Sequence, residues 1–261
     1  MCKTTYIETV TIIGSGNVAA HLALAFKNIG IKISQICSRN YTEAEIIAKN
    51  VGANAVCNLS KINTTSDYYF VAVSDSAISE VVEKMPFVSG VVAHTAGCIP
   101  ISKLEKFHSF GSFYPLQTFT KGSEIDFSKI YIFIEGNSVK TEQKLLNIAT
   151  KLTKNVRKIC SEKREVLHLA STISCNFVNH LYTISQHIVE DAGLSFDFLK
   201  PIIEETAKKA CKINPYDAQT GPAKRKDYEV LQIHLKKLCY NEKFSEIYSK
   251  ISESIMDMNY E

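Results

Sequence analysis

The chain has 261 residues, of which 45% are hydrophobic and 22% charged, and its formal net charge is +3. This is the composition of an ordinary globular protein with one large domain or two modest ones. The charge is too small, and the basic run Lys224-Arg225-Lys226 too short, to indicate a nucleic-acid partner. The N-terminal residues carry no apolar signal region. We therefore expect a cytoplasmic protein, with no membrane contact, whose partner is a small molecule.

The eight cysteines are scattered, without a Cys-x-x-Cys pair. This pattern is typical of buried thiols in a reducing compartment rather than of a disulfide framework or a zinc ribbon. His94 and Cys98 could share a metal ion, but no second pair accompanies them. We therefore expect no metal site.

Residues 1–160 alternate short apolar runs with longer mixed segments. We expect helices at 18–29, 42–51, 77–84 and 141–152, and strands at 9–13, 31–37, 53–57, 68–73, 91–94, 110–113, 130–134 and 156–160. Successive strand and helix units of this kind build a doubly wound α/β domain with a mostly parallel sheet.

The first strand runs directly into a glycine-containing turn, Gly14-Ser15-Gly16-Asn17-Val18, and then into a helix. The first glycine allows a tight turn, and the second removes the Cβ that would block a pyrophosphate, which the helix N-terminus attracts. Ala19 stands where a third small residue lets helix and strand pack closely. The order of elements predicts a Rossmann-type dinucleotide site, although similar turns also join strands and helices that bind nothing.

The end of the second strand indicates which dinucleotide is bound. About 20 residues after the last glycine, where an acidic residue would hold the ribose 2′-hydroxyl, the chain has Ser38-Arg39-Asn40. A guanidinium beside a hydroxyl can hold a 2′-phosphate through charge-assisted hydrogen bonds. We therefore expect NADP(H) rather than NAD(H), with Arg39 as a solvated surface cation as the alternative.

Later loops extend this surface, because ligands of open α/β sheets bind at the carboxyl ends of the strands. Ser74 follows the fourth strand, and Thr95-Ala96-Gly97, whose small residues would let the backbone approach a nicotinamide ring, follows the fifth. Gln117 closes the segment Phe113-Tyr-Pro-Leu-Gln after the sixth strand, where we expect substrate. Ordinary turns would also contain glycine and serine.

From residue 161 the strand pattern stops, and residues 161–261 are predicted to form an all-α domain for substrate binding and dimerisation. We expect helices at 163–192, 197–213, 226–240 and 242–256. In the second of these helices the apolar residues recur at helical spacing, so one face is expected in the core: Leu199, Ile202, Ile203, Ala207, Ala210 and Cys211.

The first of these helices has no Asp, Glu, Lys or Arg between Glu165 and Glu190. A helix without charges on any face is usually buried all round. His168, Thr172, Asn176 and either Asn179 or His180 form a polar stripe on it at helical spacing. His168 is the natural acid or base, since its reference pKa of about 6.5 lies close to neutrality. These side chains could equally satisfy one another in a helical core.

Several motifs together resemble a bacterial family that joins a Rossmann-like NADP-binding domain to a helical domain of unknown function. The motifs are the Gly14-to-Ala19 turn, Ser38-Arg39, Val71-Ala-Val-Ser-Asp, His94-Thr-Ala-Gly, Phe113-Tyr-Pro-Leu-Gln-Thr-Phe, Ile134-Glu-Gly, Cys175-Asn-Phe-Val-Asn-His and Gln219-Thr-Gly-Pro-Ala. The layout is distantly similar to pyrroline carboxylate reductase, prephenate dehydrogenase, deazaflavin-dependent NADP reductases and β-hydroxyacid dehydrogenases. The resemblance implies an NADP-linked oxidoreductase, often a homodimer through its helical domain.

One departure from these relatives concerns the central helix. The β-hydroxyacid dehydrogenases carry a Lys there, followed four residues later by an Asn, whereas this chain has His168 with Thr172 and Asn176. We expect a reductase or dehydrogenase that acts on a small carbonyl, imine or hydroxy acid in the cleft between the domains. An NADP(H)-binding sensor or assembly protein without chemistry is the alternative. A methyltransferase is a weaker one, because Ser38-Arg39 lacks the acid that would bind the ribose of S-adenosylmethionine.

Overall fold

The computed structural model describes residues 8–258 and divides into two compact units, the first ending at Cys175 and the second beginning at Asn176. The change from strands to helices falls at the predicted position, since the last strand ends at Lys158 and the next helix begins at Ser161. A boundary between domains at residue 160 stays a prediction. Within residues 8–258, no helix combines the length and apolar character that crossing a membrane requires.

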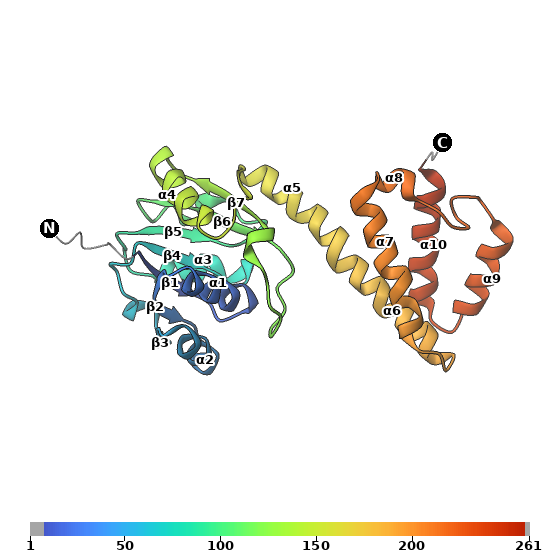
Figure 1. Ribbon diagram of the computed structural model, residues 1–261, viewed down its shortest axis with the longest axis horizontal. Coiled ribbons are helices and arrows are strands. Elements are labelled where there is room, and N and C mark those ends of the chain that lie inside the picture. Colours follow the sequence, from blue (N-terminus) through green and yellow to red (C-terminus); the bar gives the residue numbers. More distant parts are fainter. Residues whose placement is uncertain (1–7, 259–261) are drawn as a thin grey trace. The chain divides into compact units, whose positions relative to one another are not determined.

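The first unit is built on one eight-stranded sheet with the order β3-β2-β1-β4-β5-β6-β7-β8 (Figure 1). All neighbouring strands pair in parallel except β6 and β7, which are antiparallel. The strands are β1 (Thr9–Ile13), β2 (Lys32–Cys37), β3 (Asn54–Val56), β4 (Tyr68–Val71), β5 (Val91–His94), β6 (Phe110–Leu116), β7 (Tyr131–Gly136) and β8 (Val156–Lys158). Each predicted apolar run overlaps one of them, and the predicted fold class is confirmed.

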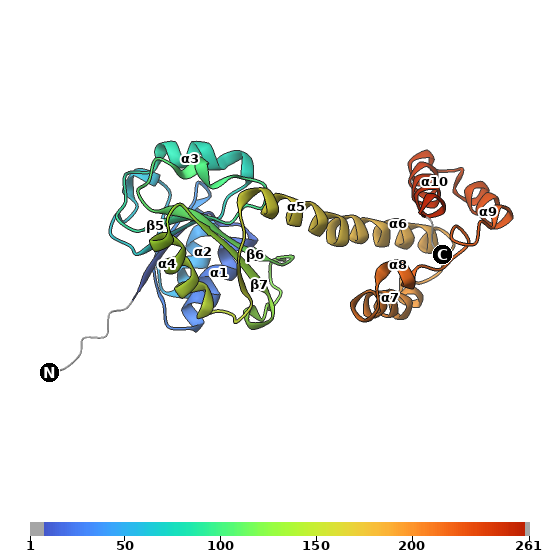
Figure 2. The ribbon, with the colours of Figure 1, turned by 90° about the horizontal axis from the view of Figure 1, so that it is seen from above.

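Helices cover both faces of this sheet, as alternation along β4 shows. Tyr68 and Phe70 belong to a core shared with α1 (Asn17–Asn28), α2 (Tyr41–Val51) and α4 (Val139–Thr150). Tyr69 and Val71 point to the other face and pack with α3 (Ile78–Lys84; Figure 2). A strand buried on both faces is apolar throughout, which explains the continuous runs in the sequence.

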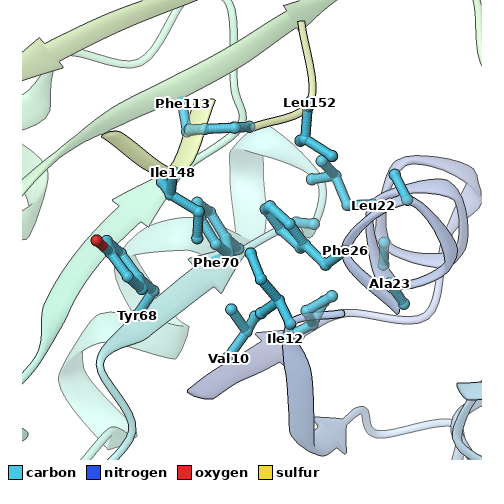
Figure 3. Packing of buried hydrophobic residues seen from close by; sticks show 14 of the residues in the cluster. Val10, Ile12, Leu22, Ala23, Phe26, Tyr68, Phe70, Phe113, Ile148 and Leu152 are labelled. Carbon is cyan, nitrogen blue, oxygen red and sulfur yellow. The ribbon is translucent and has the colours of Figure 1, made fainter. Parts of the chain in front are cut away.

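Aromatic rings fill the centre of the larger core. Phe70 lies between Phe26 of α1 and Phe113 of β6, with ring centroids 5.0 and 4.8 Å away (Figure 3). Such pairs contribute about 0.5–1.5 kcal/mol each beyond the area that they bury. These contacts hold β4, β6 and α1 together.

Strand β6 is longer than predicted. Tyr114, Pro115 and Leu116, expected in a loop, continue it and pair with Phe133, Ile132 and Tyr131 of β7. The last partner of β6 on β5 is opposite Ser112, so beyond that residue only β7 pairs with the strand. A proline is tolerated there, because the strand is an edge on that side.

The uncharged stretch forms α5 (Ser161–Ser171), a π-helical segment (Thr172–Phe177) and α6 (Val178–Asp191). The prediction that it is buried all round is wrong for the chain by itself. Its apolar side chains Val166 and Phe177 are 66% and 58% exposed. No charge on a helix indicates that its faces leave water, but it does not say whether the same chain or another molecule covers them.

The second unit is helical, as predicted, with α7 (Lys200–Lys212), α8 (Pro215–Ala218), α9 (Tyr228–Leu238) and α10 (Glu242–Asp257). The prediction that one face of α7 lies in the core is wrong, because none of its residues is buried and Ile202 is 64% exposed. Its spacing is amphipathic, yet no described segment of this chain covers the apolar face.

The cysteines also differ from expectation. Cys37 is buried, but Cys57, Cys98, Cys160, Cys175, Cys211 and Cys239 are exposed. Cys2 lies outside the described residues. Six exposed thiols correct the prediction of buried ones, since most of these cysteines lie in loops or on the exposed helices, where spacing alone does not report burial.

Candidate cofactor and active site

The glycine-containing turn lies where the chain order of the sheet reverses, between β1 and β4. Gly14 has φ +123°, and a Cβ built on it would lie 2.0 Å from the carbonyl oxygen of Ala72. A side chain is therefore excluded twice, by the backbone conformation and by the backbone of the neighbouring strand. Gly14 brings β1 and the segment after β4 into direct contact at the switch point, where ligands of such sheets bind.

Gly16 is needed for a different reason. It has φ −77°, and a Cβ built on it would meet no protein atom within 4 Å. It is the N-cap residue of α1 but offers no side chain to accept a hydrogen bond, and the first turn, which begins with Asn17 and Val18, contains no acidic residue. The N–H groups at the start of α1 are therefore available to a ligand. These donors and the space beside Gly16 fit a pyrophosphate, which needs close approach to the backbone. Ala19 is fully buried, as its role in close packing requires.

The structure brings the turn and the end of β2 together. The hydroxyl oxygens of Ser15 and Ser38 are 2.8 Å apart, and Ser38 Oγ also accepts a hydrogen bond from the backbone N–H of Asn40. The Arg39 side chain is 83% exposed, and its guanidinium lies 4.0 Å from the Glu80 carboxylate. So long and exposed an ion pair leaves Arg39 free to bind an anion.

His94, the last residue of β5, is hydrogen-bonded to the loop that follows this strand. Its ring is fully buried, and Nδ1 accepts the backbone N–H of Ala96 at 3.2 Å, while Thr95 N–H donates to the Val71 carbonyl. Burial, and then the positive charge of Arg164, lower the pKa of His94 to about 3, so the ring is neutral. Nε2 then carries the proton, and within residues 8–258 it has no hydrogen-bond partner. His94 shapes the loop rather than exchanging protons.

His168 lies directly on the same loop. A Cβ built on Gly97 would lie 2.3 Å from His168 Cγ and 2.5 Å from Nδ1, so the imidazole occupies the space that a side chain there would fill. The Tyr114 hydroxyl is 2.9 Å from His168 Nδ1, and the two rings meet edge to face. The predicted nicotinamide loop and the predicted acid are therefore neighbours.

Tyr114 is the hydrogen-bond partner of that imidazole at Nδ1. Burial raises the pKa of Tyr114 to about 12, and the neighbouring Cys98 adds to the shift, so the phenol stays protonated. A phenol can both donate and accept a hydrogen bond, so it can pair with Nδ1 whether or not that nitrogen carries a proton. Because Tyr114 occupies Nδ1, Nε2 is the ring nitrogen that remains for another partner.

Arg164, which sequence reasoning missed, anchors α5 one turn before His168. Its side chain is fully buried and donates to Glu135 Oε2 at 2.6 Å, to Ser112 Oγ at 2.9 Å and to the Ile99 carbonyl. Removing a charge from water costs several kcal/mol unless it is paired and hydrogen-bonded, as it is here. The available signal was Glu135, a carboxylate that follows the apolar run of β7, where a partly buried acidic side chain needs a cation such as Arg164 as its partner.

Other predicted site residues make no described hydrogen bond to the side chains of His168 and Tyr114. Ser74 lies after β4 with its hydroxyl 3.4 Å from Ser76 Oγ, and Gln117 is exposed, its Oε1 accepting the Thr118 N–H. Thr172 donates to the His168 carbonyl of its own helix, and Asn176 belongs to the second unit. Their roles stay predictions. Among residues 8–258, no group of three or more His, Cys, Asp or Glu side chains could hold a metal ion.

Two family models match the chain. One, described as NADP oxidoreductase coenzyme F420-dependent, matches residues 9–94, and the domain of unknown function DUF2520 matches residues 130–255. None of the curated proteins matches the chain.

Solved structures match along almost the whole length. BF3122 from Bacteroides fragilis, a candidate NADP oxidoreductase, is 37% identical with a TM-score of 0.91, covering 96% of this chain and 98% of that one. A reductive aminase from Aspergillus terreus, in complex with NADPH and ethyl-5-oxohexanoate, is 13% identical with a TM-score of 0.72, covering 98% and 96%. A 1-pyrroline-5-carboxylate reductase from Streptococcus pyogenes is 10% identical with a TM-score of 0.63, covering 96% and 98%. The last two show similarity of fold.

Proposed function

Because the chain belongs to the family that joins an NADP oxidoreductase domain to DUF2520, we propose that it transfers hydride between NADP(H) and a small carbonyl, imine or hydroxy-acid substrate. The family agrees with the cofactor predicted from the sequence. One observation carries the proposal of catalysis: the His168 imidazole packs on Gly97, at the end of β5, with Tyr114 on its Nδ1.

The proposed cofactor site runs along the carboxyl ends of the strands. The N–H groups at the start of α1 and the space beside Gly16 suit the pyrophosphate, and Ser38 and Arg39 suit the 2′-phosphate. Ser74 and the loop of Thr95, Ala96 and Gly97 would then line the path toward the nicotinamide. When bound, NADPH supplies the hydride.

His168 would supply the accompanying proton. In the reductive direction His168 would start as the imidazolium, with its Nδ1–H donating to the Tyr114 hydroxyl oxygen, and would pass its Nε2 proton to the substrate oxygen or nitrogen as negative charge builds there. The ring is then left neutral, with a lone pair on Nε2. In the oxidative direction this neutral ring would accept the proton of the substrate at Nε2. We propose Thr172, Asn176 and Gln117 as orienting groups for the substrate.

Replacement of His168 tests this proposal. His168→Ala should leave the NADPH dissociation constant within about twofold while reducing turnover about a hundredfold or more, the usual contribution of proton transfer. Turnover is followed as NADPH oxidation with a panel of small ketones, ketones with amines, cyclic imines and keto acids. His108→Ala, at an exposed position before β6 and outside the proposed site, is the matched control and should retain activity.

Unchanged turnover in His168→Ala would remove this residue from the mechanism. Tight NADPH binding by the wild-type protein without turnover on any compound would favour the alternative, a binding protein without chemistry.

We also propose a homodimer formed through the helical part of the chain. Val166 of the first unit and Phe177, Phe198 and Ile202 of the second are each more than half exposed, and a second copy could cover such apolar faces. Light scattering on the eluted protein should give twice the mass of the chain, and a monomer at micromolar concentration would contradict the proposal. We keep the cytoplasm as the proposed compartment, which would suit the exposed thiols.

A further inference from the structure

The segment 117–126, between β6 and β7, lies across the start of α1; we call it the strap (Figure 1). Asn17 Nδ2 donates to the Phe119 carbonyl at 2.8 Å. His21 Nε2 lies 2.9 Å from the Ser123 carbonyl oxygen, and its ring packs on that of Phe119 with centroids 5.3 Å apart. The strap is therefore tied to the helix whose N-terminus forms the proposed pyrophosphate site.

The strap also reaches the helix that follows Ser38 and Arg39. Lys121 Nζ lies 2.9 Å and 3.1 Å from the two carboxylate oxygens of Glu43. Glu43 is in the first turn of α2, where its N–H donates to the N-cap residue Asn40. Its contacts thus join the two helix starts that flank the proposed binding place of the adenosine and its 2′-phosphate.

The ion pair between Lys121 and Glu43 is weak enough to rearrange when a ligand binds. Lys121 is 70% exposed, and an exposed ion pair contributes at most about 1 kcal/mol. A phosphate carries nearly two negative charges and three acceptor oxygens, so it competes well with one carboxylate for a lysine ammonium. The four-carbon stem of Lys121 is flexible, so its ammonium can turn away from Glu43 toward an anion bound at the start of α2.

We propose that Lys121 is a second reader of the 2′-phosphate, which makes the strap part of the discrimination between NADP(H) and NAD(H). The inference rests on the proposed cofactor site. Glu43 holds Lys121 while the phosphate is absent, and its carboxylate repels the phosphate when it arrives. Lys121 thereby adds to Arg39 a cation from a segment far away in the sequence.

Calorimetric titration of the full-length protein with NADPH, NADH and 2′,5′-ADP tests this role. Lys121→Ala should weaken NADPH and 2′,5′-ADP about tenfold, which corresponds to about 1.4 kcal/mol, and leave NADH within about twofold. Glu43→Gln should act in the opposite direction and strengthen NADPH relative to NADH. Lys129→Ala is the control, because Lys129 also forms an exposed pair, with Asp126 at 3.2 Å.

Three results would overturn the proposal. Lys121→Ala could weaken NADPH and NADH equally, which would assign Lys121 a structural role, or leave both unchanged. Glu43→Gln could leave the ratio of the two affinities unaltered. If the wild-type protein binds NADPH and these variants bind it equally well, the role of Lys121 fails alone, whereas a wild-type protein that binds neither dinucleotide overturns the cofactor site as well. Thermal unfolding without ligand confirms that each variant is folded.

Discussion

Replacing Gly16 by alanine separates what the fold needs from what the cofactor needs. Alanine suits the backbone angles of Gly16, φ −77° and ψ −176°, and its Cβ would meet no protein atom within 4 Å. Gly16→Ala should therefore fold normally and lose only the preference of the helix N-cap for glycine, below about 1 kcal/mol. The same methyl group would occupy the space that the pyrophosphate enters.

The cost to binding follows from the cost of one methyl group in a filled site. Overpacking of this kind costs about 1–3 kcal/mol, so the NADPH dissociation constant should rise by about tenfold to a hundredfold. Gly14→Ala is the contrasting variant, because its Cβ would lie 2.0 Å from the Ala72 carbonyl oxygen at φ +123°. Strain and collision together should destabilise the fold without cofactor by about 3 kcal/mol or more.

Urea unfolding without ligand and calorimetric titration with NADPH measure the two effects separately. Wild-type affinity in Gly16→Ala would show that the pyrophosphate does not approach this residue. A loss of several kcal/mol in the unliganded Gly16→Ala protein would show that the space beside the glycine serves the fold itself.

Two buried groups give further predictions. Between pH 6.5 and 3 His94 is protonated in the unfolded chain but not in the folded chain. The free energy of unfolding should therefore decrease by about 1.4 kcal/mol for each unit by which the pH is lowered in this range. His94→Asn, whose oxygen can still accept the Ala96 N–H, should show a flatter profile in urea unfolding between pH 7 and 5; equal profiles would contradict it. Arg164→Met leaves Glu135 without its partner and should cost about 3–5 kcal/mol, part of which adding Glu135→Gln should restore; an unrelieved loss would count against the pair.

The sheet could be predicted because each strand is a short apolar run that can be recognised from its own residues. Residues 9–13 and 91–94 form strands with the predicted bounds, since both lie between helix-covered faces and are rich in β-branched and apolar residues. The turn at Gly14 and Gly16 could also be predicted, because the need for glycine there is evident from the strand before it and the helix after it. Family and fold followed from these signals together with the longer motifs.

Contacts between residues far apart in the sequence could not be predicted in this way. The burial of Arg164 depends on Glu135 and Ser112, which belong to other strands, and the polar contact of His168 is with a tyrosine predicted to lie in a loop. Lys121 reads as an ordinary surface lysine until the fold places it beside Glu43. Helix periodicity marked the apolar face of α7, but periodicity does not say which molecule covers a face.

The antiparallel pairing of β6 with β7 has a consequence for dissecting the protein. The DUF2520 match begins at residue 130, one residue before β7, so its first part supplies the strands β7 and β8 to the sheet of the first unit. Cutting the chain before residue 130 would separate β6 from β7 and leave each of the two fragments with an unpaired strand edge. Such exposed edges promote aggregation. The DUF2520 region is therefore not a separable part, and mixing the fragments 1–129 and 130–261 as two chains should rebuild one sheet rather than join two finished domains.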